Sequence, residues 1–160
     1  MFREYDILVK DILDNKEFIK IEDMPHHGTD RLTHSKRVSY YSYIICKIIG
    51  LDYVAAARAG LLHDFFINKK KKKKRTGVTS LFTHSKVALK NASKIVCLNP
   101  KERNIIVSHM FPLGIHLPQY MESWIVQGVD KVVGTYEFIE KISTEMYTKK
   151  EYIRELIRQN

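Results

Sequence analysis

The amino-acid sequence predicts an all-α protein, a compact helical bundle of one domain. Apolar residues recur at helical spacing in several segments, and we find no convincing strand-like alternation of apolar and polar residues. Capping residues and proline or glycine stops separate these segments by short connections. A chain of 160 residues with 44% hydrophobic residues can bury one core. We therefore expect residues 1–160 to form a single domain, with its core over about residues 30–140.

Three helices are expected in the first part of the chain. They cover about residues 3–19, 33–49 and 52–63. A polar segment with turn residues, 22–31, separates the first two. Thr33 is placed to cap the second helix and Gly50 to end it, because glycine readily adopts the backbone conformation of a helix stop. Asp52 is placed to cap the third helix, which runs through an alanine-rich stretch.

Four more helices are expected in the second part. They cover about residues 84–97, 100–110, 122–141 and 145–158. The start of the second of these is the clearest, since Asn99 can cap it, Pro100 suits the first helical position and Glu102 stands three residues after the cap. An irregular connection is expected over residues 112–118, which contain two prolines and a glycine.

Positive charge is concentrated in one segment. The chain has 27 Lys and Arg against 18 Asp and Glu, a net charge of +9. The run Lys69–Arg75 holds seven positive charges, and taking them from +9 leaves +2 for the rest. A nucleic-acid partner is therefore not favoured, because such a partner is typically met by basic residues spread over a face or along a helix. We favour a solvated loop for the run, with local attraction of a polyanionic substrate as the alternative.

The composition also bears on the compartment. The sequence contains no apolar stretch of a length that spans a membrane, and its first residues do not resemble a signal peptide. The two cysteines, Cys46 and Cys97, lie far apart in the sequence, each among apolar residues. We expect both thiols to be buried and reduced, and the protein to be cytoplasmic without a membrane partner.

Six residues with metal-ligating side chains are candidates for one site. They are His34, His63, Asp64, His84, His109 and Asp130. Imidazole nitrogen and carboxylate oxygen suit divalent ions of Mn, Fe, Co, Ni and Zn. The neighbours His63 and Asp64 can reach one ion where a helix frays, and the second carboxylate oxygen can bridge to another. Two such ions with two aspartates leave a surplus of positive charge, which favours a hydroxide and an anionic substrate such as a phosphate ester.

Part of this set resembles a known family. His34, the dyad His63-Asp64 and Asp130 resemble the H…HD…D pattern of the HD-domain superfamily of metal-dependent phosphohydrolases. Three surrounding segments resemble the family's ligand-bearing helices: Leu32–Val38, Ala55–Asp64 and Val129–Lys131. The resemblance covers about residues 30–140 and implies an HD-type helical domain with these four residues on a metal ion.

The resemblance also implies a choice between one and two metal ions. His84 and His109 stand where the two-metal members of the superfamily carry two further histidines. This layout is similar to that of cyclic-nucleotide phosphodiesterases and HD-GYP proteins, and to that of di-iron oxygenases such as myo-inositol oxygenase. The sequence departs from the HD-GYP pattern, because Phe65-Phe66 follows the dyad and no Gly-Tyr-Pro occurs.

The function expected is that of a metal-dependent phosphohydrolase. One or two divalent transition metal ions (Fe, Mn, Zn, Co or Ni) would activate a water molecule, and the substrate would be a small phosphate ester such as a nucleotide. We assign catalytic roles to Asp64, as a bridging ligand, and to Asp130, as the acceptor of the nucleophile's proton, with a nearby histidine as the alternative acceptor. The alternatives are a di-iron oxygenase on the same scaffold and a non-enzymatic basic module that uses the lysine run. Phosphomonoester and phosphodiester substrates both remain open, as does the oligomeric state.

Four residues are candidates for contact with the substrate. They are Arg31, His27, His116 and Lys131. The planar guanidinium of Arg31 suits oxyanions, and Lys131 follows a candidate ligand. The arginine has a surface salt bridge as its structural alternative, and the two histidines a solvated loop position. Against Lys131 stands that neighbouring positions on a helix face different directions. Asp30 is either a further ligand or a helix cap, because it stands one helical turn before His34.

Overall fold

The computed structural model describes residues 2–26, 29–67 and 77–158, and within these ranges the protein is all-α, as expected. The helices are α1 (Phe2–Leu13), α2 (Lys16–Ile19), α3 (Arg31–Ile48), α4 (Tyr53–Leu62), α5 (Gly77–Ile95), α6 (Pro100–Ser108) and α7 (Met121–Arg158). A short 3₁₀ helix, η1 (Lys20–Asp23), follows α2. Two antiparallel strands of two residues each, β1 (Pro25–His26) and β2 (Thr29–Asp30), lead into α3.

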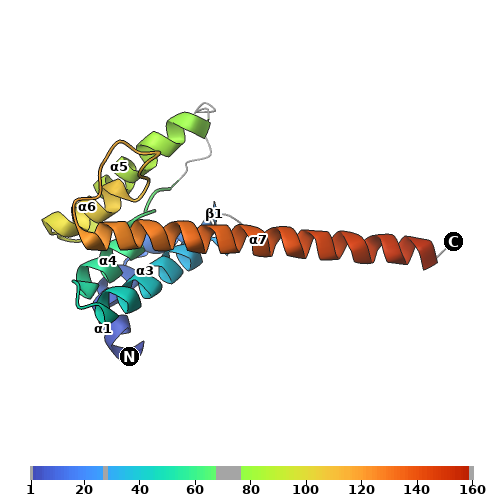
Figure 1. Cartoon of the computed structure of the whole chain (residues 1–160), viewed down its shortest axis with the longest axis horizontal. Helices are drawn as coiled ribbons and strands as arrows, with labels where there is room; N and C mark the ends of the chain where they lie inside the picture. Colours follow the sequence, from blue (N-terminus) through green and yellow to red (C-terminus); the bar gives the residue numbers. More distant parts are fainter. Residues whose placement is uncertain (1, 27–28, 68–76, 159–160) are drawn as a thin grey trace.

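Helices α3 and α4 form the centre of the fold. Helix α1 packs against α4 on one side, α6 packs on α4 and α5, and the long α7 crosses α3, α4 and α6 (Figure 1). The contact between α3 and α4 is close, since a Cβ atom on Gly60 would lie 3.1 Å from the Cα atom of Ser39. The hydroxyl of Ser39 donates to the carbonyl of Ala57 at 2.6 Å. This close approach brings the first turns of α3 and the end of α4 together.

Several expected caps are present. The carboxylate of Asp52 accepts the N–H of Ala55 at the start of α4. Asn99 and Glu102 form a reciprocal capping box at the start of α6. Gly50 has a φ of +74° and follows the end of α3, where a side chain would be strained. These local signals depend on few neighbouring residues, which is why the sequence shows them.

Two expectations for the first part of the chain were wrong. The expected helix over residues 3–19 is interrupted, because the side chain of Asn15 accepts the N–H groups of Glu17 and Phe18 and so starts α2. Thr33 does not cap α3. Asp30 does, accepting the Thr33 N–H at 2.8 Å and its hydroxyl at 2.7 Å. Both oxygens of Asp30 are engaged in the cap, which favours the structural alternative for this residue.

Two expectations for the second part were also wrong. Helix α5 begins at Gly77, so His84 lies inside it rather than at its start. The two helices expected over 122–141 and 145–158 are one continuous helix, α7. Thr144, which stood at the expected break, donates its hydroxyl to the carbonyl of Glu140 one turn earlier at 2.9 Å. A threonine that bonds back in this way stays within a helix instead of capping a new one.

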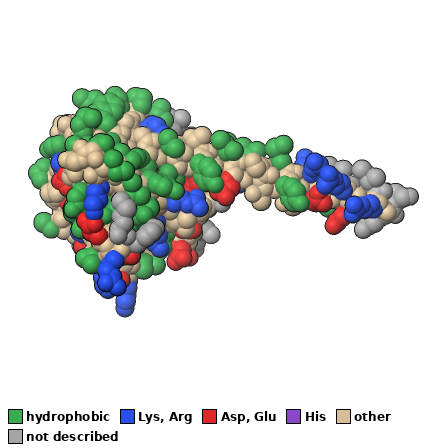
Figure 2. Space-filling model, turned by 60° about the horizontal axis from the view of Figure 1, so that its bottom comes forward, with side chains coloured by type: hydrophobic (Ala, Val, Ile, Leu, Met, Phe, Trp, Pro, Cys, Tyr) green, Lys and Arg blue, Asp and Glu red, His purple; other side chains and the backbone are tan. Residues whose placement is uncertain are grey.

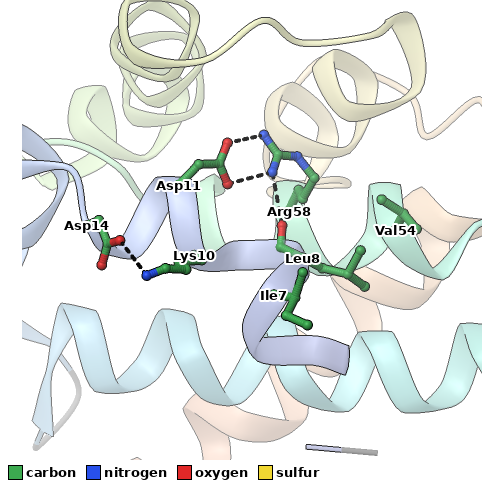
Figure 3. A pocket seen from close by; sticks show the side chains of 7 residues that line it. All are labelled: Ile7, Leu8, Lys10, Asp11, Asp14, Val54 and Arg58. Atoms are coloured by element: carbon green, nitrogen blue, oxygen red, sulfur yellow. Dashed lines mark hydrogen bonds and ion pairs between the residues drawn. The ribbon is translucent and has the colours of Figure 1, made fainter. Parts of the chain in front are cut away.

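An arginine on α4 joins three helices. The guanidinium of Arg58 forms a two-pronged ion pair with Asp11 of α1 at 2.7 and 2.9 Å and donates to the carbonyl of Leu8 (Figure 3). Its Nε lies 3.3 Å from a carboxylate oxygen of Glu102 in α6. Arg58, Asp11 and Leu8 line a surface hollow together with Val54. The contacts of Arg58 hold α1 and α6 against the helix that ends at the candidate site.

The expectation that both cysteines are buried is confirmed for one of them only. Cys46 is fully buried, as expected, but Cys97 is exposed, because it follows the end of α5 at the surface. Neither forms a disulfide.

Within the described ranges, no helix combines the length and the apolar character needed to cross a membrane.

Candidate metal centre

The six candidate ligands lie together in the fold. They come from α3 (His34), the end of α4 (His63 and Asp64), α5 (His84), the end of α6 (His109) and α7 (Asp130). Three overlapping groups place their ligand atoms within 4.8 Å of one another: His34, His63 and Asp64; His63, His109 and Asp130; and Asp64, His84 and His109. Residues spread over almost a hundred positions of sequence therefore meet at one place in the interior.

Two of the histidines are oriented by the same local arrangement. His63 and His109 each follow the last turn of a helix as its C-cap. The Nδ1 atom of His63 donates to the carbonyl of Gly60 at 2.7 Å, and that of His109 to the carbonyl of Ile106 at 2.8 Å. A carbonyl only accepts, so the proton must be on Nδ1 and the neutral ring carries its lone pair on Nε2. Both helix ends thus present a metal-ligating nitrogen.

The Nε2 atoms face other ligand atoms. His63 Nε2 is buried without a hydrogen-bond partner among the described residues and lies 3.4 Å from the Oδ1 atom of Asp130. His109 Nε2 lies 3.1 Å from His84 Nε2. Two ligands held about 2.1 Å from one ion lie about 3.0–3.4 Å apart, depending on the angle between them. The separations of 3.4 Å and 3.1 Å therefore match those of two ligands on a common ion. A bound cation would also be a partner for the lone pair on His63 Nε2.

A buried carboxylate supports the third histidine from behind. His34 Nδ1 contacts Glu137 Oε2 at 2.8 Å, while its Nε2 lies 3.0 Å from Asp130 Oδ1. The second oxygen of Glu137 accepts from Arg37 at 2.9 Å. A carboxylate on the far nitrogen fixes the tautomer of a metal-ligating histidine and raises the basicity of the other nitrogen. Glu137 is therefore placed to orient His34 toward the centre.

Asp64 lies between the remaining groups. Its Oδ1 atom is 3.5 Å from His109 Nε2 and 3.7 Å from His84 Nε2. Its Oδ2 atom is 3.8 Å from Nε of Arg31. Asp64 belongs to two of the three ligand groups, one with His34 and one with His84. This is the position a bridging carboxylate would occupy.

The electrostatics of the centre favour a cation. Burial alone would lower the pKa of His34, but hydrogen bonds to Asp130 and Glu137 outweigh it and raise the pKa to about 9. Burial would raise the pKa of Asp130, yet the contacts with His34 and His63 hold it far below its usual range. The pKa of His109 is likewise raised by Asp64 against the effect of burial. The carboxylates thus attract positive charge, and a metal ion and protons compete for the same atoms.

The donor set fits a transition metal ion. Four imidazoles and two carboxylates, all buried or nearly so, form a nitrogen-rich set of the kind preferred by Zn, Fe, Mn, Co and Ni. The buried Nε2 of His63, which lacks a hydrogen-bond partner among the described residues, is the observation that a bound cation explains best. One ion would use His34, His63, Asp64 and Asp130, and a second would use Asp64, His84 and His109.

The candidate substrate contacts have different outcomes. Arg31 is buried, not at the surface; it donates to the carbonyl of Phe66 at 2.6 Å and stacks on that ring. Lys131 is within 3.4 Å of the carbonyl of His109, so its ammonium group lies beside the centre. His116 has a buried Nε2 without a hydrogen bond in the described part of the chain, and no contact described there joins it to the six ligands. His27 and the run Lys69–Arg75 lie outside the described residues.

Sequence reasoning missed Glu137 and Arg37. Glu137 stands seven residues after Asp130 on α7, a spacing that puts both on one face of a helix. That spacing was the available signal, but it also fits ordinary surface glutamates. Only the packing of α7 on α3 identifies the partner as His34.

Comparison with known proteins gives no relative. No protein-family model matches the chain, and neither the curated proteins nor the solved structures include a match. The case for a metal centre therefore rests on the geometry described above and on the composition of its donor set.

Proposed function

We propose that this protein is a metal-dependent phosphohydrolase that uses a metal-activated water on a small phosphate ester. The observation that carries the proposal is the meeting of four histidines and two aspartates, two of the histidines having their Nε2 lone pairs directed inward by helix-end carbonyls. Metal ions in such a centre lower the pKa of bound water and stabilise charge on phosphoryl oxygens.

Four residues around the centre would have distinct roles in the reaction. Asp64 would hold two ions together, since it belongs to two ligand groups. Asp130 stays ionised because its pKa is strongly lowered, which suits a metal ligand. So weak a base is a poor proton acceptor, and a neighbouring histidine would take the proton of the attacking water more readily. The ammonium of Lys131 beside His109 would attract the negative phosphate. Arg31 would hold the carboxylate of Asp64 in place, because its Nε lies near Asp64 Oδ2 while another of its guanidinium nitrogens donates to the carbonyl of Phe66.

The sequence resemblance to the HD-domain superfamily supports the proposal. The superfamily pattern assigns one ion to His34, His63, Asp64 and Asp130, and all four take part in the ligand groups. His84 and His109 join them as the two-metal members would require. We propose membership of this superfamily on the pattern and the geometry together.

The test combines metal content with an activity screen. Protein purified without chelator would be analysed for Mn, Fe, Co, Ni and Zn. It would then be assayed for phosphate release from nucleotides and other phosphomonoesters, and for formation of a phosphomonoester from phosphodiesters. We expect bound metal and activity on some of these substrates, and loss of activity in Asp64→Asn and in His63→Ala. His116→Ala is the matched control, because no described contact joins this histidine to the ligands; it should keep its metal content.

Three results would contradict the proposal. Absence of dyad-dependent metal binding would remove the centre itself. Bound iron with oxygen-dependent chemistry and no phosphate release would instead indicate the di-iron oxygenase. Salt-sensitive nucleic-acid binding that survives His63→Ala but requires Lys69–Arg75 would indicate the basic module.

A further inference from the structure

An apolar groove runs between α3 and α7, and none of the six candidate metal ligands lines it. It encloses about 780 Å³. Its walls are mostly aliphatic and aromatic, and its lining residues include Tyr41 and Ile45 of α3 and Trp124, Gly128, Val132 and Tyr136 of α7. Several of these side chains are largely exposed, Val132 at 70% and Tyr136 at 60%. At Gly128 an added Cβ would meet no atom within 4 Å, so the floor of the groove is open there.

Helix α7 continues far beyond the rest of the fold. Figure 1 shows its second half projecting alone, and every side chain from residue 138 to residue 150 is exposed. Several of these are apolar, and hydrophobic side chains are visible along the projecting segment in Figure 2. They include Phe138, Ile139, Ile142, Met146 and Tyr147. An isolated helical segment has little stability in water, and an apolar face on it favours burial against a partner.

We propose that the partner is a second copy of this chain, with the two α7 helices antiparallel about a two-fold axis near Ile139. The projecting half of each α7 would then lie along the α3–α7 groove of the other copy. The arrangement is isologous, because each copy supplies the groove and the segment that fills it. The contact would be a four-helix layer of α3 and α7 from both copies.

The spacing along α7 supports this register. With the axis at Ile139, Val132 faces Met146 of the partner subunit, and Tyr136 faces Ile142 of the partner subunit. Ile139 meets its own symmetry mate. These positions follow one another at intervals of three or four residues, so they form a continuous stripe on one helix face. The stripe begins in the groove and continues onto the projecting segment without a break.

The available area suits a stable dimer. Eight side chains would be covered in each copy: Tyr41, Ile45, Trp124, Val132, Tyr136, Ile139, Ile142 and Met146. Their exposed fractions run from 39% to 70%. Burial of roughly 100 Å² for each would remove about 800 Å² per copy from water. A standard stable interface buries about 800 Å² per partner. The groove and the segment are thus of matching size as well as of matching chemistry.

The first test is the oligomeric state of the full chain. Sedimentation equilibrium should give twice the 18.8 kDa chain mass at micromolar concentrations. Ile139→Glu and Ile142→Glu should each weaken dimerisation at least tenfold, because they put a charge at the interface. Ile7→Glu is the matched control, since Ile7 is 68% exposed on α1 and lies outside the interface. Helical content and metal content should be unchanged in all three variants.

The second test is the relative direction of the helices. In a Cys97→Ser background, spin labels would be placed at Glu140→Cys or Arg154→Cys and the distance between the two copies measured. The antiparallel arrangement puts position 154 of the two copies about 45 Å apart, at a rise of 1.5 Å per residue, and position 140 within about 20 Å. A parallel pair would give short distances at both positions.

The outcomes separate the alternatives. A dimer that Ile139→Glu dissociates, with the long distance at position 154, supports the proposal. A monomer at all concentrations, a parallel pair, or binding of the monomer to lipid vesicles through α7 would overturn it. Neither the sedimentation measurement nor the spin-label distances depend on metal or on phosphohydrolase activity. The proposed dimer and the proposed phosphohydrolase function can therefore fail separately.

Discussion

Glu137 contacts the Nδ1 atom of His34 at 2.8 Å, on the side of the ring opposite to Asp130. The contact links α3 to α7 over 103 positions of sequence. Because Glu137 is almost fully buried and also paired with Arg37, it can hold the ring in one orientation.

We predict that Glu137→Gln lowers metal affinity. The amide has no negative charge, so it supports the basicity of His34 less and holds the ring less firmly. The expected loss is roughly 10- to 100-fold, measured by competition with a chelator of known affinity. Glu140→Gln is the control, since Glu140 is exposed on the same helix. If Glu137→Gln and Glu140→Gln bound metal with equal affinity, Glu137 would not support His34 as a metal ligand.

A second prediction concerns the number of ions. His84 belongs to one ligand group only, the one with Asp64 and His109. In His84→Ala we expect one ion per chain to remain when the wild type holds two. Asp64 belongs to two groups, so in Asp64→Ala we expect the binding of both ions to be weakened. Native mass spectrometry gives the stoichiometry directly, and an equal loss in both variants would contradict separate sites.

The close approach of α3 and α4 gives a third prediction. Gly60→Ala would place a methyl group 3.1 Å from the Cα atom of Ser39, which is backbone and cannot move alone. We expect a loss of about 1–3 kcal/mol in the free energy of unfolding, the usual cost of overpacking. In an Ile139→Glu background, which keeps the groove free of a second copy, Gly128→Ala has open space at its Cβ and should instead gain about 0.5–1 kcal/mol from helix propensity. Urea denaturation of both variants measures the difference.

The fourth prediction concerns pH and metal-free protein. The pKa of His34 is raised from 6.5 to about 9, so the folded state binds its proton more tightly than the unfolded chain. The resulting stability is fully present below pH 6.5 and is lost as pH rises to about 9. The loss from this group is roughly 3 kcal/mol for the fully buried ring. Thermal unfolding in chelator across this range should show the decline, and His34→Gln should flatten it.

Metal should reverse that trend. A ligating imidazole must give up the proton on its ligating nitrogen, so metal binding strengthens as pH rises and releases protons. Protein titrated with metal should therefore gain stability over the same pH range in which the metal-free protein loses it. A metal-induced shift of the unfolding temperature that does not depend on pH would contradict His34 as a ligand.

The sequence alone determined the helical class, most helix starts and the six candidate ligands. Caps such as Asp52 and Asn99 are set by residues within one turn, so they can be read from neighbours in the chain. The ligands stood out because their side chains share one chemistry, although only their resemblance to the HD pattern related them to one another.

The tertiary structure decided what depends on distant neighbours. Local signals predicted a break in α7 near Thr144, but its hydroxyl bonds back along the helix. The inward Nε2 atoms of His63 and His109, the support of His34 by Glu137 and the exposure of Cys97 each depend on the packed arrangement of helices. A residue's type states which bonds it can make, whereas packing decides which partner is within reach and which side chains are removed from water.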